Sequence, residues 1–332
     1  MTAPARYHIE TWGCQMNVLD ADKMSGALEA AGYVRAESAA AADVVLLNTC
    51  SIREKAAEKV FSELGRLKPL KDLRPDVVLG VCGCVAQQEG EAIFDRAPYV
   101  DLVIGTRATR SLPLLVERLR EGDETARHVV DVELRNDSIH FPFDRIRRDI
   151  TGAGKAFVTI IEGCNHRCTF CIVPQTRGRE VSRDMDDVLD EVRALAERGF
   201  QEVEFLGQTV NAYRDPQGRA LGDLLRQASR VAGIERIRFT TSHPAQMTDA
   251  LMDAMAAAQP RLCSYLHLPV QSGSTDVLRA MRRGYDREGY RAKIRGLRTR
   301  MPELCLGTDV IVGFPTETEG DFEQTLSLLE EV

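Results

Sequence analysis

The chain has 332 residues, of which 44% are hydrophobic and 28% charged, and its formal net charge at pH 7 is -7. This composition is typical of a globular protein and excludes collagen-like, mucin-like and largely disordered classes. A length of 332 residues exceeds what one hydrophobic core usually holds, so we expect two domains. The acidic net charge argues against a dedicated nucleic-acid coat protein but leaves room for local basic surfaces.

The sequence shows neither a membrane span nor a secretory signal. No uninterrupted apolar run approaches the roughly 20 residues that a membrane helix needs. The segment from Met1 to Tyr7 lacks the apolar stretch of a signal peptide. We therefore expect a cytoplasmic protein with no membrane partner. Because the cytosol keeps thiols reduced, the nine cysteines are predicted to be ligands or nucleophiles rather than a disulfide framework.

Residues 1–138 alternate short apolar runs with helical patterns, which is typical of a parallel sheet with helices between its strands. The expected strands cover residues 7–12, 44–48, 77–82, 100–104 and 129–132. The expected helices cover residues 18–31, 54–67, 87–96 and 112–120. This alternation predicts an α/β domain with a flavodoxin-like, five-stranded parallel sheet.

Residues 139–154 lose this periodicity and gather polar and turn-forming residues, which predicts a linker. The alternation resumes over 155–332, with expected strands at 157–161, 203–206, 237–240, 265–269 and 306–312. Repeating β-α units of this length predict a partial (β/α) barrel of the TIM type, with reactive groups at the carboxyl ends of its strands. The last expected helix, 321–332, leads into no strand, so we expect a barrel truncated before its last strand.

Several predicted helices of the second domain have typical capping residues at their ends. Ser182, Thr248 and Thr275 are predicted to cap the N-termini of three helices. Gly199 is predicted to end the helix that Ser182 begins.

Three cysteines lie close together in the segment GCNHRCTFC, directly after the first strand of the second domain: Cys164, Cys168 and Cys171. Three thiolates at this spacing can hold three irons of a cubane cluster and leave the fourth iron open. Structural zinc is the alternative, but it requires four closed ligands, and His166 is badly spaced to be the fourth. A chance group of buried thiols is the remaining alternative.

Three more cysteines each follow a separate strand of the first domain: Cys14 in TWGCQMN, Cys50 in LLNTCSIRE and Cys84 in VCGCVAQQ. The carboxyl ends of parallel strands meet at one edge of a sheet, so these thiols are predicted to converge. Cys82 lies within a strand and is interpreted as a buried thiol, with replacement of Cys84 as the alternative. The alternative interpretation of this trio is three unrelated thiols in the hydrophobic core.

The motif around Cys164, with aromatic Phe170 just before the third cysteine, resembles the radical S-adenosylmethionine (SAM) superfamily. In that family the open iron binds the methionine part of the cofactor, and the reduced cluster generates a deoxyadenosyl radical. The resemblance implies that Phe170 packs near the adenine. It also implies that residues after the later strands line the cofactor and substrate face; these are Gly207, Gln208, Ser242, Gln271, Ile311 and Gly313.

Further segments are similar to the methylthiotransferase family within that superfamily. They include TWGCQMN, NTCSIREKAAEKVFSELGRLK, FLGQTVNAY, TSHP, HLPVQSGS, MRRGYDREGY and TDVIVGFPTET, and they run through almost the whole chain. The resemblance implies two 4Fe-4S clusters, an auxiliary one on Cys14, Cys50 and Cys84 and a catalytic one on the trio in GCNHRCTFC, together with SAM.

The same resemblance implies a tRNA methylthiotransferase. It would add a methylthio group to the adenine ring of N6-isopentenyladenosine next to the anticodon. Expected partners are the tRNA anticodon loop and an electron donor such as flavodoxin or ferredoxin, and the chain is expected to be a monomer. Alternatives are a methylthiotransferase acting on threonylcarbamoyladenosine or on a ribosomal-protein aspartate, and a noncatalytic iron-sulfur electron carrier.

Contacts with RNA are predicted from basic residues. Residues 277–301 and 140–183 are enriched in Arg and Lys, and phosphate contacts from such segments would make binding sensitive to salt. The best candidates are Arg177, Arg179 and Arg183, which follow the radical motif; a solvated helix face is the alternative for any single arginine. Family members continue with a sixth barrel strand and a small RNA-binding β domain, and neither is expected within these 332 residues.

Overall fold

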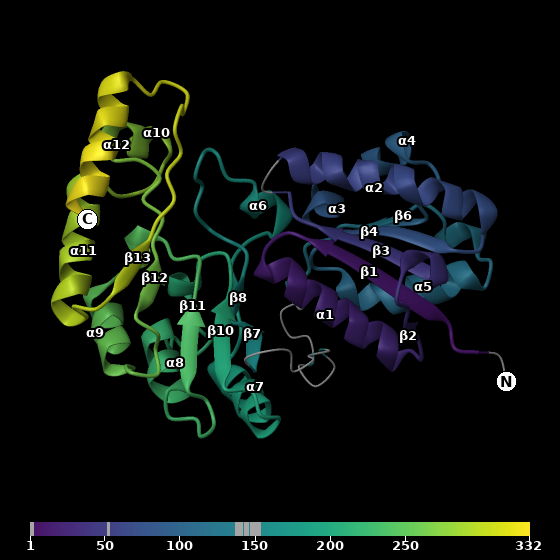
Figure 1. Cartoon of the computed structure of the whole chain (residues 1–332), viewed down its shortest axis with the longest axis horizontal. Helices are drawn as coiled ribbons and strands as arrows, with labels where there is room; N and C mark the ends of the chain where they lie inside the picture. Colours follow the sequence, from purple (N-terminus) through teal and green to yellow (C-terminus); the bar gives the residue numbers. More distant parts are fainter. Residues whose placement is uncertain (1–2, 52–53, 137–141, 143–145, 147–153) are drawn as a thin grey trace. The chain divides into compact units, whose positions relative to one another are not determined.

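The computed structural model describes residues 3–51, 54–136, 142, 146 and 154–332 (Figure 1). The chain forms two compact units. Unit 1 consists of Met1–Asp149 and a short later segment, Gln175–Gly178. Unit 2 consists of Ile150–Pro174 and Arg179–Val332. The predicted linker, 139–154, lies outside the described residues except at positions 142, 146 and 154.

Unit 1 contains a six-stranded sheet in the order β2-β1-β3-β4-β5-β6, and all its strand pairs are parallel. The strands are β1 (Arg6–Trp12), β2 (Val34–Arg35), β3 (Val44–Thr49), β4 (Val78–Gly83), β5 (Leu102–Ile104) and β6 (Val129–Asp131). The five predicted strands are confirmed, and their order is the flavodoxin-like one. The sixth, β2, was not predicted because two exposed edge residues carry no periodicity.

Helices cover both faces of this sheet (Figure 1). They are α1 (Gln15–Ala30), α2 (Glu54–Leu73), α3 (Cys84–Glu89), α4 (Ala92–Arg96) and α5 (Leu112–Arg120), with short 3-10 turns η1 (Ala39–Ala41), η2 (Thr109–Ser111) and η3 (Glu124–Ala126). The single helix predicted over 87–96 is wrong. It is split into α3 and α4 at Gly90, whose φ of +53° is a left-handed conformation that does not continue a helix.

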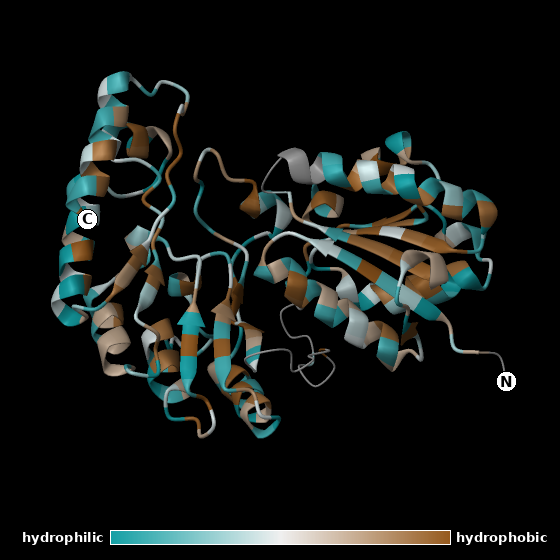
Figure 2. Ribbon diagram, viewed as in Figure 1, coloured by the Kyte–Doolittle hydropathy of each residue, from teal (hydrophilic) through white to brown (hydrophobic). Residues whose placement is uncertain are grey.

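The alternation of side chains along β3 explains the two covered faces. Val45 and Leu47 pack in one buried cluster with residues of α2, α3 and α4. Val44 and Leu46 pack in another cluster with residues of α1 and α5. Successive side chains of a strand point to opposite faces, so β3, which is apolar on both faces, must be covered on both. The apolar colouring of the central strands follows the same pattern (Figure 2).

The described part of unit 2 contains seven strands: β7 (Lys155–Thr159), β8 (Ile161–Glu162), β9 (Val181–Ser182), β10 (Glu202–Leu206), β11 (Arg236–Phe239), β12 (Tyr265–His267) and β13 (Cys305–Gly307). All of them except β8 and β9, which pair with each other in antiparallel fashion, have parallel partners. One sheet has the order β11-β10-β7, and β12 pairs with β13. A parallel bridge between Ile237 and Leu262 connects β11 to the segment that leads into β12. The parallel strands thus follow one another as in the predicted partial barrel.

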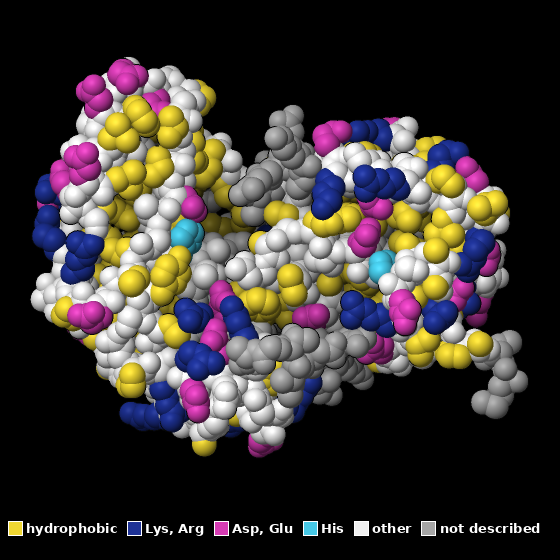
Figure 3. Space-filling model, in the orientation of Figure 1, with side chains coloured by type: hydrophobic (Ala, Val, Ile, Leu, Met, Phe, Trp, Pro, Cys, Tyr) yellow, Lys and Arg dark blue, Asp and Glu magenta, His cyan; other side chains and the backbone are white. Residues whose placement is uncertain are grey.

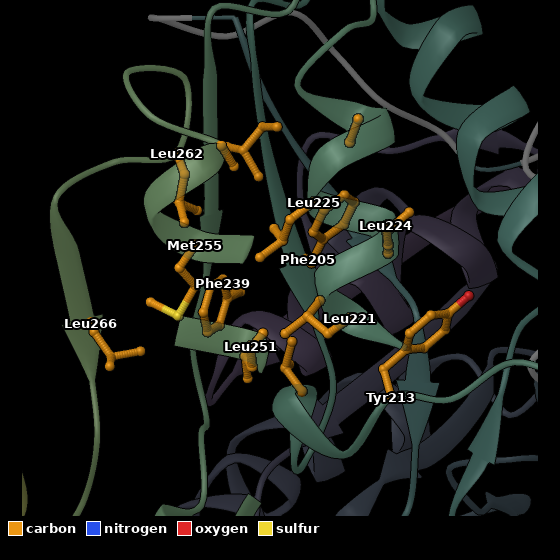
Figure 4. Packing of buried hydrophobic residues seen from close by; sticks show 14 of the residues in the cluster. Phe205, Tyr213, Leu221, Leu224, Leu225, Phe239, Leu251, Met255, Leu262 and Leu266 are labelled. Atoms are coloured by element: carbon orange, nitrogen blue, oxygen red, sulfur yellow. The ribbon is translucent and has the colours of Figure 1, made fainter. Parts of the chain in front are cut away.

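Helices separate most of these strands. They are α6 (Val173–Thr176), α7 (Met185–Glu197), α8 (Leu221–Ala228), α9 (Asp249–Ala257), α10 (Thr275–Ala280), α11 (Arg287–Arg300) and α12 (Glu319–Glu331), with 3-10 turns η6 (Val210–Ala212) and η7 (Pro244–Gln246). Apolar side chains of α7, α8, α9, α11 and α12 meet the strands in one buried core, part of which is drawn in Figure 4. In that view Phe205 of β10 and Phe239 of β11 lie among Leu221, Leu225 and Leu251 of α8 and α9.

One of the three predicted helix caps is confirmed and two are displaced. Thr248 caps α9 by accepting a hydrogen bond from the backbone N of Leu251. The cap of α7 is Asp184 instead of Ser182, because Ser182 is taken up by pairing of β9 with β8. The cap of α10 is Ser274, one residue before the predicted Thr275. Gly199, with φ of +89°, follows the end of α7 as predicted.

None of the described helices is both long enough and apolar enough to cross a membrane.

Gly80 in the middle of β4 should tolerate no side chain. A Cβ atom built there would lie 2.7 Å from Cδ1 of Leu102 and 2.8 Å from Cδ2 of Leu46. Gly80→Ala is therefore expected to lower the free energy of unfolding by about 1–3 kcal/mol, the usual cost of overpacking a core. Urea denaturation followed by circular dichroism measures this change.

Gly65→Ala is the matched control, because Gly65 lies in α2 with nothing within 4 Å of a Cβ atom. It should raise the free energy of unfolding by up to about 1 kcal/mol, since alanine favours the helix over glycine. Equal midpoints for the two variants would contradict the packing described for β4.

Candidate metal centres

Cys14, Cys50 and Cys84 converge at the carboxyl edge of the unit 1 sheet. They follow β1, β3 and β4, which are neighbours in the sheet. Trp12 pairs with Thr49, and Thr49 pairs with Gly83, so the three strands end at the same level. The thiol of Cys50 is hydrogen-bonded to those of both Cys14 and Cys84. The structure thus brings the predicted trio together.

Two glycines leave room for this convergence. A Cβ atom at Gly13 would lie 2.6 Å from Cβ of Cys50, and one at Gly83 would lie 2.5 Å from Oδ1 of Asn48. Asn48 is fully buried and donates from Nδ2 to the carbonyl oxygen of Asn17 at 2.7 Å. Side chains at either glycine would therefore push apart the backbone that carries the cysteines.

The thiols of this trio are chemically different from their buried neighbour. The hydrogen bond to Cys50 is the largest cause that lowers the pKa of Cys14 to about 6, and it lowers the pKa of Cys84 to about 6 as well. The positive charge of Arg177 lowers both further. Burial raises the pKa of Cys82 to about 12. Thiolates bind metals, so Cys84 suits a ligand and Cys82 does not.

Two of the three predicted RNA contacts are corrected by their burial. Arg177 is only 2% exposed and pairs with Asp20 at 2.6 Å within unit 1. Arg183 is 6% exposed and pairs with Glu191 at 2.5 Å within unit 2. Neither guanidinium lies at the surface, because each compensates a buried carboxylate. Arg179 is exposed and stays the RNA candidate.

Cys164, Cys168 and Cys171 lie in the loop between β8 and α6. The end of β10 fixes the start of this loop: Oε1 of Gln208 accepts a hydrogen bond from the backbone N of Gly163 at 2.5 Å, and Oγ1 of Thr209 lies 3.2 Å from Sγ of Cys164. The backbone N of Cys171 donates to the carbonyl oxygen of Cys168 at 3.1 Å. The loop is therefore held by unit 2 at one end and by its own turn at the other.

Burial sets the chemistry of this second trio. It raises the pKa of Cys164 and Cys171, whose thiols are half-buried. A cavity of about 380 Å³ opens beside the loop and is lined by Cys164, Asn165, His166, Arg167, Pro174 and Arg179. The thiol of Cys164 and the basic side chains of Arg167 and Arg179 thus line the same cavity.

The residues expected to line the cofactor face occupy the ends of successive strands. A Cβ atom at Gly207, after β10, would lie 2.4 Å from Cγ2 of Ile161, so only glycine fits there. The hydroxyl of Ser242, after β11, is buried and lacks a hydrogen-bond partner among the described residues. Gln271 adopts φ of +74° and shares a parallel bridge with Val310.

The remaining expected contacts are less enclosed. The backbone N of Ile311 donates to the carbonyl oxygen of Gln271 at 2.8 Å. Gly313 is exposed, with φ of +73°. Phe170 is 40% exposed. Contact of these residues, and of Gly207, Gln208, Ser242 and Gln271, with a cofactor stays a prediction.

The donor sets fit two iron-sulfur clusters. Each set offers three thiols, and cubane clusters are held by cysteine thiolates that bind separate irons. Among the described residues, no group of three or more His, Cys, Asp or Glu surrounds a single ion position. Gly13 and Gly83 form a cradle in unit 1, and in unit 2 a buried guanidinium, that of Arg283, donates to Sγ of Cys168 at 3.3 Å.

Three residues that contribute to the two cysteine sites were not predicted from the sequence. Asp20 and Asn17 lie on the buried face of α1 with Leu19 and Met24, and polar residues on such a face are a signal that could have been used. Arg283 follows the exposed Arg282, and nothing in the local pattern shows which of the two is buried.

The basic stretch 277–301 is largely neutralised in the folded chain. Arg291 pairs with Glu331 at 2.7 Å, Arg295 with Glu288 at 2.7 Å, and Arg300 with Asp253 at 2.6 Å. On the face shown in Figure 3, Lys and Arg side chains are interspersed with Asp and Glu. This stretch is therefore a weaker RNA surface than its sequence predicts.

Comparisons with known proteins cover both units. The model described as "Uncharacterized protein family UPF0004" matches residues 6–105, and that of the Radical SAM superfamily matches residues 158–329. A tRNA-2-methylthio-N(6)-dimethylallyladenosine synthase of Cereibacter sphaeroides is 50% identical over 333 residues, covering 100% of this chain and 74% of the relative. A protein of the same name from Methylococcus capsulatus is 51% identical, covering 99% of this chain and 71% of the relative.

Solved structures show the same fold at low sequence identity. The radical S-adenosylmethionine methyltransferase TsrM from Kitasatospora setae matches with a TM-score of 0.70 and 16% identity. The match covers 99% of this chain and 71% of that chain. The order of an α/β unit followed by a radical SAM barrel is therefore shared with a known enzyme structure.

In the metal-free chain, iodoacetamide should alkylate Cys14 with a half-maximal rate near pH 6. The pKa of Cys14 is lowered to about 6, so its reactive thiolate is present above that pH and is lost below it. Cys82, with a pKa raised to about 12, should stay unmodified at neutral pH. Peptide mass spectrometry after timed, oxygen-free alkylation measures both sites. A midpoint at Cys14 near that of a free cysteine, about 8.5, would contradict the described thiol contacts.

Proposed function

We propose that this chain, which belongs to the family of tRNA-2-methylthio-N(6)-dimethylallyladenosine synthases and to the radical SAM superfamily, is a tRNA methylthiotransferase. It adds a methylthio group to the adenine ring of N6-isopentenyladenosine next to the anticodon. The names of its relatives favour this substrate over threonylcarbamoyladenosine and over a ribosomal-protein aspartate. The noncatalytic electron carrier, the other alternative, lacks support from these relatives.

The observation that carries the proposal is the presence of two separate thiol trios, one in each unit. Cys14, Cys50 and Cys84 meet at the edge of one parallel sheet. The second trio lies in one loop after β8. Each trio would supply three ligands to a cubane cluster and would leave one iron without a cysteine ligand from that trio.

Two open irons suit a reaction with two tasks. The carbon to be modified carries an aromatic C–H bond that is far too weak an acid for any side-chain base, so general base catalysis does not suffice. When bound, the cluster of unit 2 and SAM supply the radical that activates this bond, and the auxiliary cluster of unit 1 supplies the site for the sulfur.

The chain's own residues position these groups. Cys164, Cys168 and Cys171 would hold the radical cluster, and Gln208 and Thr209 fix the loop that carries them. The residues after the strands of unit 2, such as Gly207 and Ser242, would line the SAM site. In unit 1, Cys14, Cys50 and Cys84 would hold the auxiliary cluster.

The proposal extends to the partners of the chain. The substrate is the anticodon loop of a tRNA, because single-stranded loops expose bases that helical RNA hides. Arg179 contributes a phosphate contact. A flavodoxin or ferredoxin delivers the electrons, the chain acts as a monomer, and the reaction takes place in the cytoplasm, where mature tRNA is found.

Loss of the auxiliary cluster should abolish the modification of tRNA. In a strain deleted for the gene and complemented with Cys50→Ala, we expect methylthio-isopentenyladenosine to fall below about 1% of the wild-type level, because two thiolates cannot retain the cluster. The unmodified isopentenyladenosine should accumulate instead. Mass spectrometry of digested tRNA nucleosides measures both.

Cys82→Ala is the control, since Cys82 lies within β4 and its pKa is raised to about 12 by burial. It should restore the modified nucleoside. An unchanged nucleoside profile in the deletion strain itself would overturn the proposed substrate.

A further inference from the structure

We propose that Arg283 is a positioning residue of the cluster site on Cys164, Cys168 and Cys171, where its buried guanidinium supplies the counter-charge of the bound cluster. This inference rests on the proposed function, because it requires a cluster on these cysteines. The feature that carries it is a buried cation that contacts a cysteine sulfur and pairs with no described carboxylate.

Three acceptors hold the guanidinium of Arg283 in place. Nη1 donates to Sγ of Cys168 at 3.3 Å, Nη2 donates to the carbonyl oxygen of Pro269 at 3.1 Å, and Nε donates to the hydroxyl of Tyr285 at 3.0 Å. The Tyr285 hydroxyl donates in turn to the carbonyl oxygen of Val270 at 2.8 Å. The backbone after β12 therefore fixes the guanidinium, and its remaining donor edge faces the sulfur of Cys168.

The turn that carries Arg283 points this side chain inward. Its neighbours, Arg282 with φ of +57° and Gly284 with φ of +72°, are exposed and adopt left-handed conformations, whereas Arg283 is only 6% exposed. The same turn anchors the cysteine loop, because the backbone N of Thr169 donates to the carbonyl oxygen of Met281 at 3.2 Å. The sulfur of Cys168 and the guanidinium are thus held together by both backbone and side-chain bonds.

Two of the other buried arginines pair with a buried carboxylate, whereas Arg283 pairs with none in the described part of the chain. Arg177 pairs with Asp20 at 2.6 Å and Arg183 pairs with Glu191 at 2.5 Å. The acceptors of Arg283 are a sulfur, a carbonyl and a hydroxyl, and its guanidinium lies 5.5 Å from the ring centroid of Tyr285. No carboxylate in the described part of the chain therefore compensates its charge. A buried charge without a counter-charge is strongly unfavourable, and arginine cannot escape by losing its proton.

A cluster bound by three thiolates is the anion that this site requires. Its four-iron core carries two positive charges in the oxidised state and is outweighed by three thiolates, and one added electron makes it more negative. The nearby His243 does not supply a second positive charge beside Arg283. His243 and His166 stack with ring centroids 3.8 Å apart, and burial, together with the charge of Arg283, lowers the pKa of His243 to about 2. His243 is therefore neutral at pH 7.

Arg283 is therefore expected to make the cluster on Cys164, Cys168 and Cys171 easier to reduce. One electron passes from an external reductant to the cluster, and Arg283 neither gains nor loses a proton. Because the reduced cluster is the more negative state, a fixed positive charge and a hydrogen bond at Cys168 Sγ stabilise it more than the oxidised state. Arg283 thus favours the state that reacts with SAM.

The test uses the full chain with Cys14, Cys50 and Cys84 replaced by alanine, so that one cluster remains. After oxygen-free reconstitution, the protein is held at a fixed potential with dithionite and mediator dyes, and EPR measures the reduced fraction. Arg283→Gln should bind about four irons and show a tenfold lower ratio of reduced to oxidised cluster, which corresponds to about 59 mV for one electron. Arg282→Gln, at the exposed neighbour, should match the parent.

Each outcome decides the inference. Equal ratios in Arg283→Gln and Arg282→Gln, with iron retained, would overturn it and leave the proposed function standing. Absence of iron from the parent would overturn both. If Arg283→Gln loses its iron, the Arg283→Lys variant decides, because lysine keeps the positive charge without the shape of the guanidinium. Iron retained by Arg283→Lys would support the role of Arg283 as a counter-charge. Iron lost from both variants would overturn that role, because the site would then require the shape of the guanidinium rather than its charge.

Discussion

The architecture of unit 1 depends on one geometric constraint: parallel strands that are neighbours in a sheet end at the same edge. β1, β3 and β4 are such neighbours, and a cysteine follows each of them within two residues. Three thiols that are far apart in the chain are therefore delivered to one place without any local motif. The packing of the sheet, whose central strands are buried on both faces, holds the three thiols together.

Close approach of backbone is the second requirement at both sites. In unit 1, Gly13 and Gly83 keep the space beside Cys50 and Asn48 open. In unit 2, Gly207 lets the end of β10 pass against Ile161, so that Gln208 and Thr209 reach the cysteine loop. The positions of the cysteine sulfurs thus depend on these glycines as much as on the side chains around them. Substitution of the glycines by larger residues is therefore not tolerated without a shift of the backbone.

Most of the strands and both thiol trios could be predicted because they are local signals: apolar runs, and cysteines at strand ends or in one short loop. The helix break at Gly90 and the cap at Asp184 were missed because pairing and backbone conformation decide them. Burial of Arg177 and Arg183 was missed for a different reason. Their carboxylate partners are revealed only by the fold, so a basic segment looked like a surface. Arg283 was hidden in the same way, 115 positions from the sulfur it contacts.

The central claim is that the chain holds two clusters on two independent sets of three cysteines. Iron and acid-labile sulfide analysis after oxygen-free reconstitution tests it most directly, combined with alanine replacement of one trio at a time. The account predicts about eight irons in the wild-type chain and about four in each triple variant, the contents of two cubanes and of one. About four irons in the wild-type chain, or an unchanged iron content after replacement of Cys14, Cys50 and Cys84, would contradict it.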